Sequence, residues 1–205
     1  MGADERIFKN LDMRNYELVP VPWLPFRDDD DIRSYARRLS EQIHGENPII
    51  LGLSLGGMLA VEIGKVRATE KIFLVSSAKT SSELPVFSKI PKAEMLIDLI
   101  PRFLFTKSSY IGSRLAGAKN ADDWSIISEM REDVPAGFMK RALKIVVAWN
   151  NNVHPRNVIH IHGTKDMIIP SSNVRPDHWI KGGTHIMIYN RAQEVSKIIS
   201  DCLSK

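Results

Sequence analysis

The 205-residue sequence predicts an α/β fold with a mostly parallel sheet flanked by helices. Apolar runs of the buried-strand type alternate with amphipathic segments of helical spacing, and the runs lie at 49–53, 71–77 and 157–163. Strands that alternate with helices form parallel sheets, because each strand reaches its neighbour through a crossover connection. The second observation is a glycine-rich turn at 52–57, which joins the first apolar run directly to a helix.

The other predicted elements follow from local patterns. Residues 16–23 alternate like a strand, but Pro20 and Pro22 lack ladder N–H groups, so we expect a short strand or an edge strand. Four aspartates at 28–31 precede an apolar helical face; the helix dipole explains them, and a cation site is the alternative. The patterns also predict a short helix at 5–11, a helix over 32–43, a strand at 178–180 and a helix at 191–203.

The segment 79–150 differs from the rest of the chain. Prolines separate helix-like pieces at 93–100, 124–132 and 136–150, and no strand pattern occurs. This composition predicts a helical insertion that covers one face of the sheet within a single domain of residues 1–205. Residues 79–119 contain seven basic and three acidic side chains. A solvated charged face explains this excess, and attraction of anionic substrates is the alternative.

Composition limits the cellular setting and the partners. The single cysteine, Cys202, excludes an internal disulfide and a cysteine-rich metal site. No apolar run approaches the roughly 18 residues of a membrane helix, and the sequence MGADERIFKN does not resemble a signal peptide. The net charge of +4 is diffuse, without interleaved basic and aromatic residues. We therefore expect a cytoplasmic protein without a nucleic-acid or membrane partner.

One serine lies at the apex of the glycine-rich turn. A serine on so sharp a strand-to-helix turn has a strained backbone, and the residues two before and two after it crowd its Cβ. Gly52 and Gly56 are expected to relieve that crowding, and Gly57 to let the helix pack closely on the sheet. The turn would present the Ser54 hydroxyl above the unpaired N–H groups of the helix N-terminus.

Three predicted strands each end in a residue that suits nucleophilic catalysis, in the chain order Ser54, Asp166, His185. In a parallel sheet the carboxyl ends of the strands meet at one edge, where ligands bind. A histidine can take the proton of a serine hydroxyl, and an aspartate can fix the imidazole tautomer.

These residues resemble those of the α/β-hydrolase family, in which nucleophile, acid and histidine follow in this order. Residues 52–57 (GLSLGG) resemble the nucleophile elbow, HGTKD at 162–166 with Pro170 resembles the acid loop H-G-x-x-D-x-x-x-P, and GGTH at 182–185 resembles the histidine loop. The resemblance covers the whole chain and places 79–150 at the position of the family's helical cap.

The resemblance implies a serine hydrolase that acts on a small ester or thioester. Ser54 would form the acyl-enzyme, His185 would transfer the proton, Asp166 would orient His185, and the backbone N–H of Leu55 would be an oxyanion donor. The partner would be a small-molecule acyl substrate, with no cofactor and no metal. The alternatives are an acyltransferase or a C–C bond hydrolase on the same residues, or a binding protein that has lost catalysis.

Two further alternatives concern the site residues. Asp177 could replace Asp166 as the acid. His160 and His162 share one face of a strand and could be metal ligands, but His162 matches the structural histidine of the family's acid loop and no third ligand is evident.

The first residues resemble the end of the family's oxyanion loop, P-G-x-G-A-D-x-R-x-F. The match begins inside that motif, so Met1 would take the position of the second oxyanion donor, where a free amine is a poor substitute for an amide. The family also has a strand between those expected at 16–23 and 49–53. These features predict a shortened form of a longer hydrolase, with a natural short form that binds without catalysis as the rival hypothesis.

Overall fold

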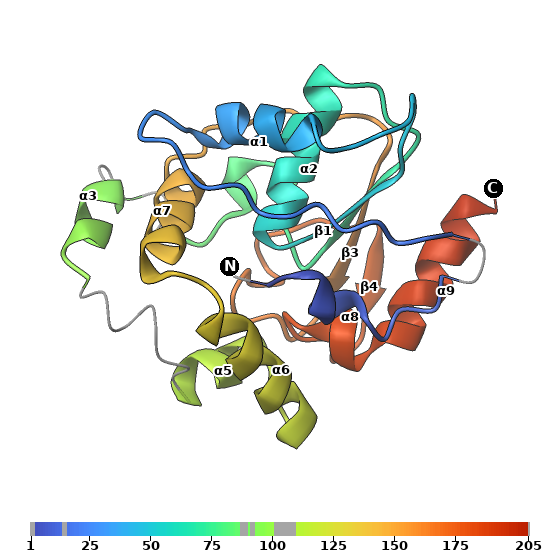
Figure 1. Cartoon of the computed structure of the whole chain (residues 1–205). Coiled ribbons are helices and arrows are strands. Elements are labelled where there is room, and N and C mark those ends of the chain that lie inside the picture. Colours follow the sequence, from blue (N-terminus) through green and yellow to red (C-terminus); the bar gives the residue numbers. More distant parts are fainter. Residues whose placement is uncertain (1–2, 14–15, 87–89, 91–92, 101–109, 205) are drawn as a thin grey trace.

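The computed structural model describes residues 3–13, 16–86, 90, 93–100 and 110–204 (Figure 1). In these residues one sheet contains four parallel strands in the order β1-β2-β3-β4. The register places Ile50 opposite Ile72 and Ile72 opposite Val158. The predicted α/β class with a mostly parallel sheet is confirmed, and the strands are β1 (Ile50–Leu53), β2 (Ile72–Val75), β3 (Val158–Gly163) and β4 (His178–Ile180).

Helices cover both faces of this sheet (Figure 1). Successive side chains of a strand point to opposite faces, so Ile72 and Leu74 join one hydrophobic cluster while Phe73 and Val75 join the other. The first cluster contains side chains of α1 (Ile32–Ser40), α2 (Leu55–Val66) and α7 (Ala136–Val147). The second contains side chains of η1 (Glu5–Phe8), α6 (Ala121–Glu132), α8 (Met187–Asn190) and α9 (Ala192–Leu203).

The described part of the segment 79–150 is helical and contains no strand. Besides α6 and α7, the segment contains η2 (Ser81–Glu83), α3 (Ala93–Asp98) and α5 (Tyr110–Ala116). The helices predicted there are present. The sequence patterns did not predict α5, which contains a glycine that weakens its helical signal. No helix among the described residues is long and apolar enough to cross a membrane.

The acidic run before α1 has protein partners. The Asp31 carboxylate accepts hydrogen bonds from the backbone N–H groups of Arg33 and Ser34, and the Ser34 hydroxyl accepts one from the Asp31 N–H. This capping box begins the helix. The buried Asp30 carboxylate pairs with Arg38. These two aspartates therefore have structural roles at the start of α1.

The strand expected at 16–23 is absent, and this prediction is wrong. Pro20 and Pro22 cannot donate to a ladder, and the segment makes side-chain contacts instead: Trp23 Nε1 donates to the Ala3 carbonyl and Gln42 Nε2 donates to the Pro22 carbonyl. Most of its apolar residues are exposed, with Val19 at 73%, whereas Trp23 is half-buried. The second edge of β1 is consequently without a partner strand among the described residues.

Candidate active site

The structure brings together the three residues that end the predicted strands. Ser54 follows β1, Asp166 follows β3 and His185 follows β4. His185 Nε2 lies 3.0 Å from Ser54 Oγ, and His185 Nδ1 lies 2.8 Å from Asp166 Oδ2. Because a carboxylate only accepts, His185 Nδ1–H donates to Asp166, which leaves Nε2 to accept from the Ser54 hydroxyl. The arrangement can remove a proton from Ser54.

The turn around Ser54 has the strain expected of it, with φ at +52°. A Cβ on Gly52 would lie 2.4 Å from the Gly56 carbonyl oxygen, and a Cβ on Gly57 would lie 2.4 Å from Ser77 Oγ. Both glycines are therefore required by close approach. The expectation for Gly56 is wrong, because a Cβ there would point into open space with no atom within 4 Å.

The start of α2 places unpaired backbone donors beside Ser54. The Ser54 carbonyl accepts the Gly57 N–H at 3.0 Å and the Ser77 hydroxyl at 2.6 Å, which fixes the turn to the residues after β2. The Leu55 N–H has no acceptor among the described residues, as expected for the first turn of a helix. Met1, the other predicted oxyanion position, lies outside the described residues.

Asp166 is buried and held by its own loop. Its Oδ1 accepts from the backbone N–H groups of Ile168 at 2.9 Å and Ile169 at 3.0 Å. Burial by itself would raise the pKa of the Asp166 carboxyl, but the charge and hydrogen bond of His185 keep that pKa below its ordinary value. Asp177, the alternative acid, instead accepts from the His160 N–H at 2.8 Å and does not contact His185.

Two buried histidines support the Asp166 loop. His160 Nε2 lies 3.1 Å from His162 Nδ1, and His162 Nε2 lies 3.0 Å from the Ile169 carbonyl oxygen. Burial, and to a lesser extent the charge of His162, lowers the pKa of His160 to about 3, and burial also lowers the pKa of His162. Both rings are thus neutral at pH 7. Among the described residues no group of three or more potential metal ligands gathers.

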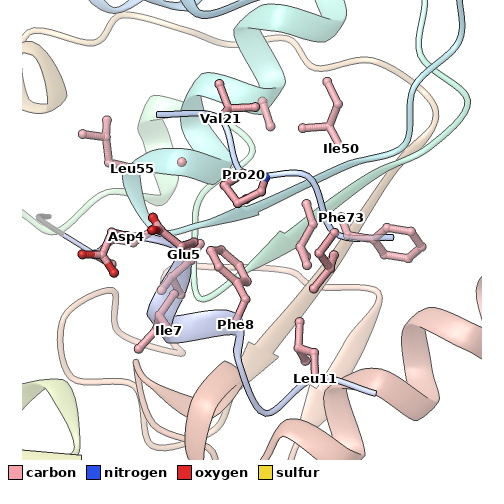
Figure 2. Close-up of a pocket in the computed structure, with 18 of the residues that line it drawn as sticks. Asp4, Glu5, Ile7, Phe8, Leu11, Pro20, Val21, Ile50, Leu55 and Phe73 are labelled. Carbon is pink, nitrogen blue, oxygen red and sulfur yellow. The ribbon is translucent and has the colours of Figure 1, made fainter. Parts of the chain in front are cut away.

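Ser54 and His185 open into a cavity of about 760 Å³ with a mainly apolar lining. Figure 2 shows Ile7 and Phe8 of η1 on one side of this cavity, and Pro20 and Val21 near Ile50 on the other. Helix α6 adds lining residues that the sequence analysis did not single out, namely Ile127, Met130 and Arg131. Their spacing of three and four residues is the signal that could have indicated a shared helix face.

Comparisons with known proteins agree with this architecture. The structure is similar to a thermophilic esterase, with a TM-score of 0.67 and 16% identity over 99% of this chain and 86% of that one. It is similar to an esterase from Exiguobacterium antarcticum, with a TM-score of 0.61 and 13% identity over 85% of this chain and 74% of that one. It is also similar to a hydrolase from Pseudomonas aeruginosa PA01, with a TM-score of 0.63 and 12% identity over 90% of this chain and 74% of that one. At these identities the likeness shows the fold.

A search of curated protein sequences finds no match. The family model described as "Alpha/beta hydrolase family" matches residues 10–198, which is most of the chain and includes all three residues of the hydrogen-bonded chain. The protein therefore belongs to the alpha/beta hydrolase family and is a hydrolase of that family.

Proposed function

We propose that this protein is a serine hydrolase that cleaves a small ester or thioester through an acyl-enzyme. The observation that carries the proposal is the continuous hydrogen-bonded chain from Ser54 through His185 to Asp166, in which Ser54 and His185 line an apolar cavity. A serine hydroxyl is a weak nucleophile until a neighbouring base takes its proton, and His185 Nε2 is within reach of that proton.

In this mechanism Ser54 Oγ attacks the carbonyl carbon of the substrate as its proton moves to His185 Nε2. The imidazolium gives that proton to the leaving alcohol or thiol, and the carbonyl–leaving-group bond breaks. Water, deprotonated by His185, then hydrolyses the acyl-enzyme and regenerates Ser54. The Asp166 carboxylate, whose pKa is below its ordinary value, stays charged and stabilises the imidazolium. The Leu55 N–H would bind the oxyanion at the N-terminus of α2.

We also infer that the chain forms one domain in which residues 79–150 act as a cap over the site. The side chains of Ile127 and Met130 on α6 and of Met139 on α7 support this inference, because they line the same cavity as Ser54. A small-molecule acyl substrate would bind between these helices and the sheet. We also propose that the protein is located in the cytoplasm.

The test is intact-mass analysis after treatment with a fluorophosphonate, which phosphonylates activated serines. We expect one adduct on the wild-type protein, no adduct on Ser54→Ala, and normal labelling of Ser125→Ala, which removes an exposed serine of α6. Hydrolysis of 4-nitrophenyl butyrate should fall by at least about a thousandfold in Ser54→Ala.

A folded wild-type protein that gains no adduct would contradict the proposal and favour a binding role. Adding an alcohol as acceptor to the ester assay distinguishes the acyltransferase alternative from hydrolysis. Dominant formation of the new ester over the free acid would reassign the reaction, while the roles of Ser54, His185 and Asp166 would remain.

A further inference from the structure

Arg131 is a cation in the wall of the candidate active site that has no ion-pair partner in the part of the chain that the structure describes. It lies near the C-terminal end of α6 and lines the cavity onto which Ser54 and His185 open. Its guanidinium has no hydrogen-bond acceptor and no carboxylate within 4.0 Å among the described residues. Its side chain is partly buried, and this burial lowers the pKa of the guanidinium without any compensating neighbour. Arginine still stays charged under these conditions, so a residue with a partly desolvated charge lines the cavity.

The position of Arg131 in α6 helps to explain why it has no partner among the described residues. Side chains three and four residues away on a helix are its neighbours, and towards the N-terminus these positions hold Ile127 and Ser128, neither of which is acidic. Towards the C-terminus α6 ends at Glu132, so no further helical turn offers a partner.

The other charged side chains of the cavity do not compensate Arg131. Asp4 is engaged by Arg6, and Lys9 lies over the ring of Tyr189. Glu5 and Glu17 also line the cavity, but neither comes within ion-pair distance of Arg131. By contrast, Arg6 pairs with both Asp4 and Asp133. Arg131, which has no such partner among the described residues, thus differs from Arg6.

We propose that Arg131 binds a negatively charged group of the substrate, so that the preferred substrate is an ester or thioester whose acyl part carries a carboxylate or phosphate. This inference rests on the proposed function and specifies its substrate class. The planar guanidinium offers paired N–H donors that match the oxygens of a carboxylate or phosphate, and the partly desolvated setting strengthens such a bond. The apolar lining would hold the carbon chain between the charged group and the scissile carbonyl.

The experiment compares two activated esters of similar size. One is 4-nitrophenyl butyrate, which is neutral, and the other is the mono-4-nitrophenyl ester of glutaric acid, which carries a free carboxylate. For Arg131→Met we expect kcat/KM for the glutarate ester to fall by about 10- to 100-fold, as for other hydrogen bonds to charged groups, while kcat/KM for the butyrate ester changes less than about twofold. Arg131→Lys should keep part of the preference because it keeps the charge.

Arg156→Met is the matched control, because it removes the same charge from an exposed position just before β3. It should leave both substrates unaffected, whereas a similar loss in this variant would mean that net charge alone sets the preference and would overturn the proposal. An equal effect of Arg131→Met on both esters, or no effect on the glutarate ester, would also overturn it.

A binding measurement separates this inference from the proposed function. Glutarate itself should raise the unfolding temperature of the wild-type protein and of Arg156→Met, and not that of Arg131→Met. That result with normal fluorophosphonate labelling supports both proposals. The same result without labelling would leave the anion site standing and overturn the hydrolase mechanism, whereas labelling without stabilisation by glutarate would overturn the anion site alone.

Discussion

The glycines around Ser54 carry different constraints although they belong to one turn. A Cβ on Gly52 would collide with the backbone of Gly56, which cannot move without displacing the start of α2. A Cβ on Gly56 would meet nothing, because it points away from the turn into open space. Both glycines lie two residues from Ser54, so the sequence alone predicts the same role for them. The path of the backbone shows that only Gly52 is in a crowded position.

We therefore expect Gly52→Ala to destabilise the protein by about 2–4 kcal/mol, because a backbone clash must be relieved by moving the turn. Gly56→Ala should change the free energy of unfolding by less than about 1 kcal/mol, and favourably if at all, since alanine is the better helix former. Urea unfolding of both variants measures this difference. A similar cost at the two positions would contradict the geometry of the turn.

The catalytic candidates were predictable from the sequence because each lies in a short motif whose backbone is fixed locally. Ser54 follows a buried strand and precedes a helix, and Asp166 and His185 follow the last two strands. Parallel pairing then brings these loops to one edge of the sheet. The proposed role of Arg131 was not predictable in this way, because it depends on the lack of a nearby carboxylate among the described residues, which only the folded structure shows.

At the scale of elements, the strands and long helices follow from apolar periodicity, whereas residues 16–23 do not. Their alternation of apolar and polar residues resembles a strand, but a β-strand forms only where its backbone makes hydrogen bonds to a neighbouring strand. The Ile50 and Ser54 N–H groups donate to the Lys71 and Val75 carbonyls of the β2 side, so the N–H groups of Leu51 and Leu53 point the other way. No described residue pairs with them in a ladder, because the segment 16–23 passes this edge across a cavity.

This free edge has a measurable consequence in amide hydrogen exchange. We expect the amides of Leu51 and Leu53 to exchange at least about a hundredfold faster than that of Leu74, whose strand is paired on both sides. Of these, Leu53 and Leu74 are both buried residues of strands, so the comparison of Leu53 with Leu74 is the more direct test of pairing. Equal protection, measured by NMR on the purified protein, would contradict a free edge and would mean that another segment covers β1 in solution.

At the scale of the molecule, buried polar groups join parts of the chain that are distant in sequence. The buried Glu62 of α2 accepts hydrogen bonds from Trp149 Nε1 at 2.7 Å and from Lys65 Nζ at 2.8 Å, and Lys65 Nζ also lies 2.6 Å from Asn151 Oδ1. This network attaches the end of the segment 79–150 to the helix that begins at the nucleophile. Trp149 is buried, but its hydrogen bond to Glu62 could not be inferred from the sequence, because apolar periodicity predicts which face of a helix is buried and not which residue it contacts.

The histidine pair beneath the site couples the stability of the whole molecule to pH. The pKa of His160 is lowered from its ordinary value of 6.5 to about 3, mainly by burial, with His162 and Lys79 also lowering it. Between these two pH values the unfolded chain binds a proton at this position and the folded protein does not. Stability must therefore fall as the pH decreases below about 6.5 and reach a plateau above about 7. The lowered pKa of His162 acts in the same direction.

For His160 alone, the loss between pH 7 and pH 5 is about 2 kcal/mol of unfolding free energy. We expect His160→Gln to lose less stability than the wild-type protein over this interval by about that amount, although the variant starts from a lower stability at pH 7 because glutamine fits the buried site poorly. His154→Gln is the control, because it makes the same replacement at an exposed position. Urea unfolding at the two pH values measures the difference. If His160→Gln and the wild-type protein lose the same free energy, His160 is protonated in the folded state, and the neutral pair that supports the Asp166 loop does not exist at pH 5.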